Sequence, residues 1–255
     1  MTNTCETDAA LSCTADAGGP GPSRCGHATT NVCASCRVKD ISVCAALDPG
    51  ELTALSAMSE KSVLAAKETL FLQGDVADAV YNVTCGMLRL YKLLPDGRRQ
   101  IVGFLLPGDF VGLSLSERFG FSADAIETVS ACRLDRATFA RFVDLKPHLL
   151  RRLHEAATHE LTVAQDHMVL LGRRSAEEKV AAFLLSMRER LRRLGGSSVT
   201  IPLPMTRQDL ADHLGLTLET VSRVISRLAR DRIILVVPDG IRILDLSRLE
   251  RLGAS

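Results

Sequence analysis

The sequence predicts an α+β protein in which an antiparallel β-roll is followed by a long helix and a winged helix-turn-helix. Three patterns carry this prediction. Short β-like runs alternate with Gly and Pro turns over residues 63–143, and apolar residues recur at three- and four-residue steps after Pro147. Two short helices with clear caps, followed by a hairpin, occupy residues 206–244.

The composition sets the expected domain boundaries, and 255 residues give room for two domains and a connecting helix. Residues 1–30 are rich in Thr, Ala, Gly and Pro and lack a period, so we expect a disordered lead there. We assign residues 31–146 to the roll and a cysteine-bearing loop, and residues 147–173 to the long helix. The C-terminal domain is assigned to residues 174–255.

The elements before the long helix are predicted from caps and turns. Asp48 and Glu51 predict a short capped helix that ends near Met58. After it, glycines stand at the boundaries of the β-like runs, and this spacing favours an antiparallel β-roll or jelly roll. These glycines are Gly74, Gly86, Gly97 and Gly108.

The long helix begins at Pro147 and carries an apolar seam. Such a seam predicts pairing with a second copy of the helix, although packing against the roll gives the same pattern, and we expect part of the seam to do that. The seam consists of Leu150, Leu153, Ala157, Leu161, Ala164, Met168 and Leu171. A further helix, opened by Ser175 and Glu178, leads into the C-terminal domain.

The helix-turn-helix is predicted from the residues that cap and end its two helices. Thr206 and Asp209 form a sequence close to a capping box, Gly215 ends the first helix, and Thr217 caps the second. The second helix runs from Leu218 to about Arg230. Residues 233–237 and 241–244 are strand-like and are joined by a Pro-Asp-Gly turn, which predicts the wing.

The outward face of the second helix carries Glu219, Ser222 and Arg223. A guanidinium can donate two hydrogen bonds to guanine, a carboxylate accepts from cytosine, and a hydroxyl serves a base or a phosphate. This face therefore predicts base reading in the major groove of DNA. An ordinary salt bridge between Glu219 and Arg223 is the structural alternative.

Residues 206–228, TRQDLADHLGLTLETVSRVISRL, resemble the DNA-binding signature of the CRP/FNR superfamily of bacterial transcription regulators. The E-x-x-S-R pattern within ETVSR is similar to the FNR branch, and the resemblance covers most of the chain from about residue 33. It implies that Glu219, Ser222 and Arg223 contact a palindromic TTGAT-N4-ATCAA-like operator in double-stranded DNA. It also implies a cyclic-nucleotide-binding fold for the roll, a homodimer paired through the long helix, and contact of the 95–99 hairpin tip with RNA polymerase.

Four cysteines are candidate ligands of a metal cluster or members of a redox site. Cys33, Cys36 and Cys44 form a compact set, and Cys132 lies far away in the sequence. Four thiolates match the needs of a [4Fe-4S] cluster, although zinc and dithiol redox sites use the same residues. Three clustered cysteines plus one in ETVSAC resemble the FNR pattern, which implies a [4Fe-4S] cluster bound by these four. Cys25 is an alternative ligand, because the interval from Cys36 to Cys44 is longer than in some family members.

The resemblance implies an oxygen-responsive transcription activator. Cluster loss in oxygen is expected to shift the protein away from the DNA-competent dimer, so that oxygen acts as an off signal. Several FNR-like proteins carry an acidic residue at the position of Ala164, where like charges weaken pairing. Here that repulsion is absent, and we expect the cluster-free protein to dimerise readily.

Other functions are weighed from the same residues. A cyclic-nucleotide sensor needs an Arg beside a small hydroxyl residue, but Phe121 precedes Ser122 and Arg118 is out of register. A zinc-based or thiol-based redox regulator remains open. We do not expect an enzyme, because there is no phosphate loop and no G-x-S-x-G motif.

Charge and hydropathy bear on the binding partner and on the cellular location of the protein. Residues 151–255 hold 17 Lys and Arg against 13 Asp and Glu, so the basic excess lies in the half predicted to bind DNA. The sequence shows neither an apolar run near 18 residues nor a charged-then-apolar leader. We therefore expect a cytoplasmic protein without membrane contact.

Overall fold

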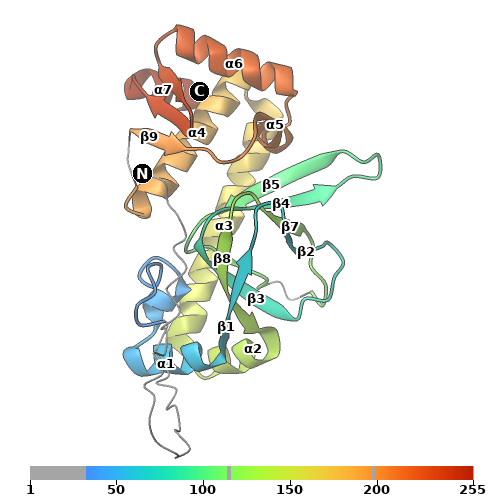
Figure 1. Ribbon diagram of the computed structural model, residues 1–255, viewed down its shortest axis with the longest axis vertical. Coiled ribbons are helices and arrows are strands. Elements are labelled where there is room, and N and C mark those ends of the chain that lie inside the picture. The colour runs from blue at the N-terminus through green and yellow to red at the C-terminus, as the bar shows by residue number, and fades with distance from the viewer. Residues whose placement is uncertain (1–32, 114–115, 197–198, 255) are drawn as a thin grey trace, which may run out of the picture.

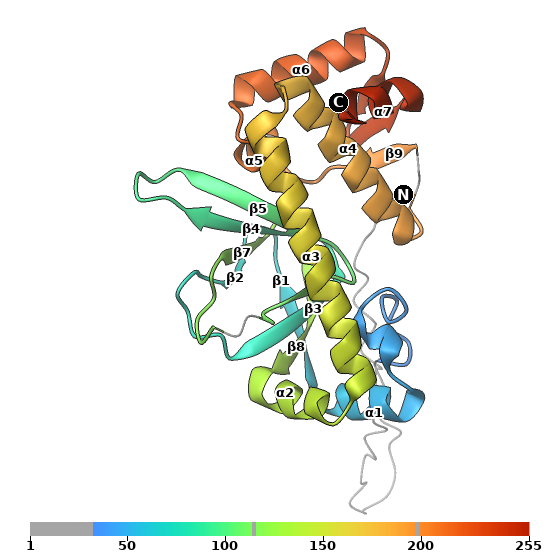
Figure 2. The same cartoon turned by 180° about the vertical axis from the view of Figure 1, so that it is seen from behind.

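The computed structural model describes residues 33–113, 116–196 and 199–254. The predicted disordered lead and Cys25 lie outside the described residues. Figure 1 shows a β-roll and a C-terminal domain that are joined by a long helix, α3 (Pro147–Arg173). Figure 2 shows α3 running along one side of the roll, from α1 and α2 up to α5. The predicted α+β architecture is confirmed.

The roll consists of two antiparallel sheets that face each other. The sheets have the strand orders β1-β8-β3-β6 and β2-β7-β4-β5, and their inward side chains form the core of the roll. The strands are β1 (Ser59–Leu64), β2 (Thr69–Phe71), β3 (Ala79–Cys85), β4 (Leu88–Leu93), β5 (Arg99–Leu105), β6 (Phe110–Val111), β7 (Ser122–Ala125) and β8 (Val129–Asp135). All four predicted boundary glycines have positive φ, as the turns between these strands require.

Short helices flank the roll at its end away from the C-terminal domain. The 3-10 helix η1 (Val43–Ala46) and α1 (Pro49–Met58) precede β1, and α2 (Arg136–Asp144) follows β8. Asp48 and Glu51 form the predicted capping box of α1. Residues of η1, α1, α2 and the start of α3 share one hydrophobic core, which ties the N-terminal segment to α3.

The C-terminal domain surrounds a second core that includes residues from the roll. Its elements are α4 (Ala176–Arg193), β9 (Thr200–Pro202), α5 (Arg207–Leu214), α6 (Leu218–Arg230), β10 (Ile234–Val237), β11 (Gly240–Ile243) and α7 (Leu246–Ala254). The core takes in Ile101 and Phe104 from β5 of the roll. Sequence reasoning predicted α4 with its capping box, α5, α6 and the hairpin, but it missed β9 and α7. No described helix is long and apolar enough to cross a membrane.

Candidate functional site

The turn between α5 and α6 is held by hydrogen bonds between neighbours in the sequence. Thr206 Oγ1 accepts from the Asp209 amide at 3.1 Å, and the Asp209 carboxylate accepts from the Thr206 amide at 3.0 Å. Gly215 ends α5 with a φ of 62°, and Thr217 Oγ1 accepts from the Thr220 amide at 3.2 Å. The helix-turn-helix is thus specified locally.

The predicted base-reading side chains lie on the outer side of α6, which Figure 1 shows at the end of the molecule farthest from α1. Glu219 and Arg223 are exposed and Ser222 is half-buried, while Val221, Ile225 and Leu228 are buried beneath them. Arg223 Nε donates to the backbone carbonyl of Glu219 at 3.4 Å. The guanidinium therefore contacts the helix backbone, whereas the structural alternative pairs it with the Glu219 carboxylate.

The wing follows α6 as a three-stranded sheet in the order β10-β11-β9. Val237 pairs with Gly240, so Pro238 and Asp239 form a two-residue turn. Gly240 lies so close to β9 that an added Cβ would stand 2.1 Å from the Ile201 carbonyl oxygen. Only glycine fits there without moving the strand.

The apolar seam of α3 divides into two parts. Leu153 is 8% exposed and packs with Leu149 in the core of its own chain, so the prediction that places Leu153 in a dimer interface needs correction. Leu171 is half-buried, with its Cδ2 close to Gly215 of the C-terminal domain. The remaining seam residues, Leu150, Ala157, Leu161, Ala164 and Met168, are exposed.

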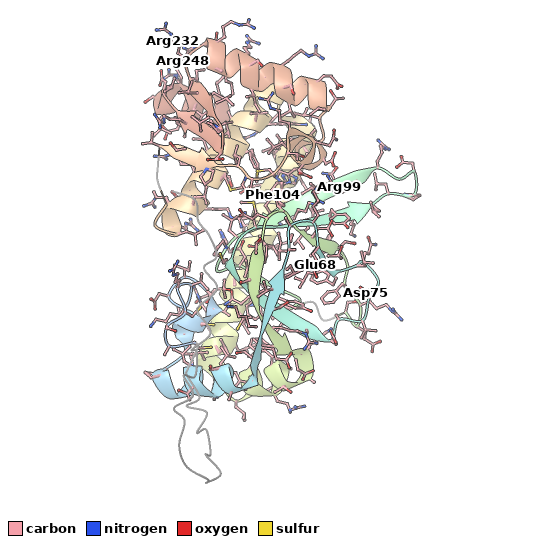
Figure 3. All side chains as sticks on the ribbon, viewed as in Figure 1. Glu68, Asp75, Arg99, Phe104, Arg232 and Arg248 are labelled. Carbon is pink, nitrogen blue, oxygen red and sulfur yellow. The ribbon has the colours of Figure 1, made fainter. Side chains whose placement is uncertain are left out.

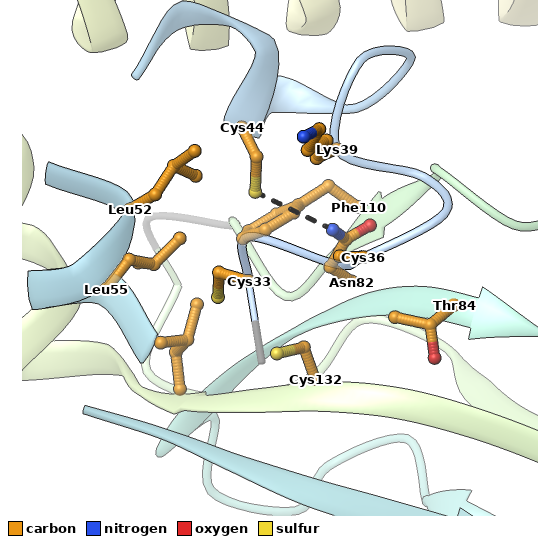
Figure 4. Close-up of a pocket in the computed structure, with 11 residues that line it drawn as sticks. Cys33, Cys36, Lys39, Cys44, Leu52, Leu55, Asn82, Thr84, Phe110 and Cys132 are labelled. Atoms are coloured by element: carbon orange, nitrogen blue, oxygen red, sulfur yellow. Dashed lines mark hydrogen bonds between the residues drawn. The ribbon is translucent and has the colours of Figure 1, made fainter. Parts of the chain in front are cut away.

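The four predicted cysteine ligands line a single pocket, which we call the cysteine pocket (Figure 4). Cys33, Cys36 and Cys44 come from the segment before α1, and Cys132 comes from β8. The rest of the lining is largely apolar. It consists of Leu52, Leu55, Phe110 and Leu134, with Lys39, Asn82 and Thr84 as the polar members.

The thiols of the cysteine pocket affect one another. A hydrogen bond from Cys132 lowers the pKa of Cys33 to about 6. The same contact, together with burial, raises the pKa of Cys132. Burial also raises the pKa of Cys44. The pocket therefore favours one ionised thiol beside protonated ones, and a positively charged group bound there would favour further ionisation.

Asn82 of β3 is a pocket residue that sequence reasoning missed. Its side chain is buried, and Nδ2 lies 3.9 Å from Cys44 Sγ (Figure 4). Asn82 Oδ1 has no hydrogen-bond partner among the described residues. Asn82 and Cys132 are register partners on β3 and β8. An isolated Asn within a β-like run gives no signal of this role, because only strand pairing brings it to the cysteines.

The four cysteines of the pocket are residue types that could hold either an iron–sulfur cluster or a zinc ion. A zinc ion needs its thiolates to converge at about 2.3 Å from one point. Within the described ranges, no group of three or more His, Cys, Asp or Glu side chains is placed to hold a metal ion. A [4Fe-4S] cluster takes one thiolate per iron and so needs the thiolates arranged around it. Four cysteines around one pocket meet that need.

The interior of the roll is occupied by aromatic side chains. The rings of Phe71 and Phe119 stack with centroids 3.8 Å apart, and Tyr81 packs beside them. Arg118 donates to the Gly74 carbonyl at 2.6 Å, and the buried Ser122 hydroxyl accepts from the Gln73 amide. The residues considered for a cyclic phosphate are thus engaged in contacts within the roll.

Comparison with known proteins agrees with this architecture. Residues 178–252 match the Crp-like helix-turn-helix domain, and residues 61–145 match the cyclic nucleotide-binding domain. The nitrogen fixation regulation protein FixK of Bradyrhizobium diazoefficiens is 53% identical over 223 residues, which cover 88% of this chain and 94% of that protein. The transcriptional activatory protein AadR of Rhodopseudomonas palustris is 50% identical over 220 residues, covering 86% and 92%.

A solved structure, that of FixK2 from Bradyrhizobium japonicum, superposes with a TM-score of 0.72. It is 38% identical and covers 77% of this chain and 98% of its own. A cyclic-nucleotide-binding fold joined to a winged helix-turn-helix defines a DNA-binding transcription regulator and not an enzyme. The chain belongs to the CRP/FNR family, and within that family it is similar to FixK and AadR.

Proposed function

We propose that this regulator responds to oxygen through a [4Fe-4S] cluster bound by Cys33, Cys36, Cys44 and Cys132. The observation that carries the proposal is the cysteine pocket itself, because it joins Cys132 of β8 to three cysteines that precede α1. The apolar lining and the Asn82 amide beside Cys44 suit a buried cluster whose sulfurs accept hydrogen bonds. When bound, the cluster supplies a tie between the N-terminal segment and β8 that oxygen destroys.

The chain itself connects this pocket to α3. Cys33 and Val43 lie in the same core as Leu149 and Leu153 of α3. The carboxylate of Glu51, in α1, lies 2.9 Å from His148 Nε2 of α3. Loosening of the N-terminal segment would therefore remove packing partners from the first turns of α3.

We further propose that α3 pairs with its equivalent in a homodimer. The exposed apolar side chains Leu150, Leu161 and Met168 form a seam suited to a second copy. A twofold axis along α3 would present two copies of α6 to a palindromic TTGAT-N4-ATCAA-like site, where Glu219, Ser222 and Arg223 read the bases. Because Ala164 brings no like charge to the seam, the cluster-free protein is expected to dimerise more readily than a strict oxygen switch would need.

The family resemblance also bears on where the regulator acts and on its contact with RNA polymerase. Such a regulator acts in the cytoplasm as an activator. The 95–99 hairpin tip, in which residues 95–98 are exposed, is a surface that RNA polymerase can contact. AadR is itself named a transcriptional activatory protein.

A thiol-based switch is the second candidate, because Cys33 and Cys132 line the same pocket and Cys132 lowers the pKa of Cys33. Oxidation of these two thiols by a peroxide would form one disulfide, release two protons and pass two electrons to the peroxide. This switch would link the same two segments in oxidised protein instead of in anaerobic protein.

The test is an absorption spectrum of anaerobically purified protein before and after air, with iron, sulfide and zinc measured on the same sample. A brown protein with iron and sulfide near four per chain, bleached by air, is expected for a [4Fe-4S] cluster. A colourless protein that gains a disulfide in air would favour the thiol switch, and a colourless protein loaded with zinc would contradict both.

A further inference from the structure

Two arginines of the roll reach across to the first helix of the helix-turn-helix. Arg89 of β4 and Arg99 of β5 pair with Asp209 and Asp212 of α5, and we call these four residues the roll–reader latch. Figure 3 shows Arg99 at the end of the roll that faces the C-terminal domain. The latch joins segments more than a hundred positions apart in the sequence.

The contacts of the latch are short and numerous. Arg89 Nη1 donates to Asp209 Oδ1 at 3.0 Å, and Arg99 Nη2 donates to the same oxygen at 2.6 Å. Arg99 also holds Asp212 Oδ2 through Nε at 3.0 Å and Nη2 at 2.8 Å. Paired contacts of this kind fix the direction as well as the distance between a guanidinium and a carboxylate.

Asp209 is central to this arrangement. Its side chain is 3% exposed, and its other oxygen accepts from both the amide and the hydroxyl of Thr206, so the same carboxylate closes the capping box of α5. Burial would raise the pKa of Asp209, but the hydrogen bonds from Thr206 and the charges of Arg89 and Arg99 hold it below its usual value. A carboxylate this buried needs its positive partners, and the roll provides them.

Neighbouring contacts continue the latch along β5. Gln100 Nε2 donates to the His213 carbonyl at 3.4 Å, and the His213 ring lies 3.2 Å from the Ile101 carbonyl oxygen. The His213 ring packs edge-on against Phe104 and Phe183 and stacks on His167 of α3. At this one place the roll, α3 and α5 all meet.

We propose that the roll–reader latch is a positioning device that fixes the orientation of α5 and α6 relative to α3. In the homodimer of the proposed function, on which this inference rests, that orientation sets the distance between the two copies of α6. Half-site spacing mirrors this distance in twofold-symmetric regulators. The latch thereby determines which number of base pairs between the two half-sites is preferred. Arg223 and its neighbours determine which bases are preferred within each half-site.

The test uses full-length protein and a series of duplexes in which the half-sites are separated by N4 or by a spacer one base pair shorter or longer. Arg99→Gln should reduce the preference for N4 by roughly 2- to 150-fold, the range that corresponds to coupling energies between residues in contact. Affinity for a single half-site should stay near that of the wild type. A merely structural role would weaken every duplex equally.

Arg98→Gln is the matched control, because Arg98 lies beside Arg99 but, among the described residues, its side chain pairs only with Asp96 within the hairpin tip. Asp212→Asn tests the latch from the other side, and combining it with Arg99→Gln should cost no more spacer preference than Arg99→Gln alone. If both single variants keep the wild-type preference, the latch proposal is overturned and the operator proposal stands. A wild-type protein that binds all spacers equally would overturn the palindromic operator and the latch together.

Discussion

The helix-turn-helix and the cysteine pocket are organised in opposite ways. The caps of α5 and α6 come from Thr206, Asp209 and Thr217, each bonded to a residue three positions away. The cysteine pocket draws its walls from the N-terminal segment, β3 and β8, and its buried Asn82 leaves an oxygen without a partner among the described residues. The caps of the helix-turn-helix are formed by nearby residues of the same segment, whereas the cysteine pocket gathers thiol donors from distant segments around a cavity.

This difference shows where regulation can enter. The caps of the helix-turn-helix are made within the module, and its core and Asp209 are completed by residues of the roll. The cysteine pocket is where a bound group would change the structure most. Its effect on DNA binding must then pass through the placement of the domains, by way of α3 and the roll–reader latch.

The largest expected effect comes from breaking the pocket. Cys132→Ser should remove the iron and sulfide of anaerobic protein almost completely, because the other three predicted ligands all lie on the N-terminal segment and no longer join it to β8. Arg133→Gln is the control, since Arg133 points to the opposite face of β8 and pairs with Glu60 and Asp78. Measurement of iron and sulfide in both variants tests this prediction. Full iron content in Cys132→Ser would remove Cys132 from the ligand set.

The two parts of the α3 seam should respond differently to substitution. Leu153→Ala should lower the free energy of unfolding by about 2–5 kcal/mol, as expected for a leucine buried in its own core. Leu161, which is 59% exposed, should behave otherwise. Leu161→Glu should weaken the dimer by more than about tenfold, because it places a charge on an apolar interface.

Urea unfolding and analytical ultracentrifugation separate these two effects. A Leu161→Glu protein that sediments as the wild type does would show that the exposed seam is not the dimer contact.

A smaller and more specific effect is expected at the helix-turn-helix. Arg223→Ala should cost about 1–3 kcal/mol of binding free energy and relax discrimination at one base pair, because a guanidinium that pairs with guanine is lost. Binding to operators with single base changes measures this. Equal weakening on every sequence would instead mean that Arg223 holds a phosphate.

The most gradual effect is a pH dependence at the place where the domains meet. Burial of its ring lowers the pKa of His213 to about 3. The pKa of a histidine in the unfolded chain is about 6.5. Between these values the unfolded chain binds the proton and the folded chain does not. The free energy of unfolding should therefore fall as the pH is lowered through this window, by at most about 1.4 kcal/mol per pH unit.

Urea unfolding of the wild type and of His213→Phe over this pH range checks the effect. The variant should show a shallower slope, and an identical slope in the two proteins would exclude His213 as its source.

The sequence allowed the local features to be predicted, and the reason is physical. A cap such as Ser175 with Glu178, or a turn glycine such as Gly215, acts within a few residues, so its pattern is visible in the chain. Burial of Leu153 was not predictable in this way, because a helical stripe has the same period whether it faces its own roll or a second copy.

Pairings between distant segments were also beyond the sequence. Asn82 meets Cys44 and Arg99 meets Asp209 only after the strands and domains have assembled. The four cysteines could be grouped because the resemblance to the FNR pattern brought Cys132 together with the other three. Their spacing alone would have left Cys132 apart.

The most direct test of the account is operator binding by one anaerobic preparation, measured before and after exposure to air, for the wild type and for Cys132→Ser. The account predicts that the wild type binds the TTGAT-N4-ATCAA duplex tightly without oxygen and loses that affinity in air, while Cys132→Ser binds weakly in both conditions. Equal binding by the two proteins, unchanged by air, would contradict it.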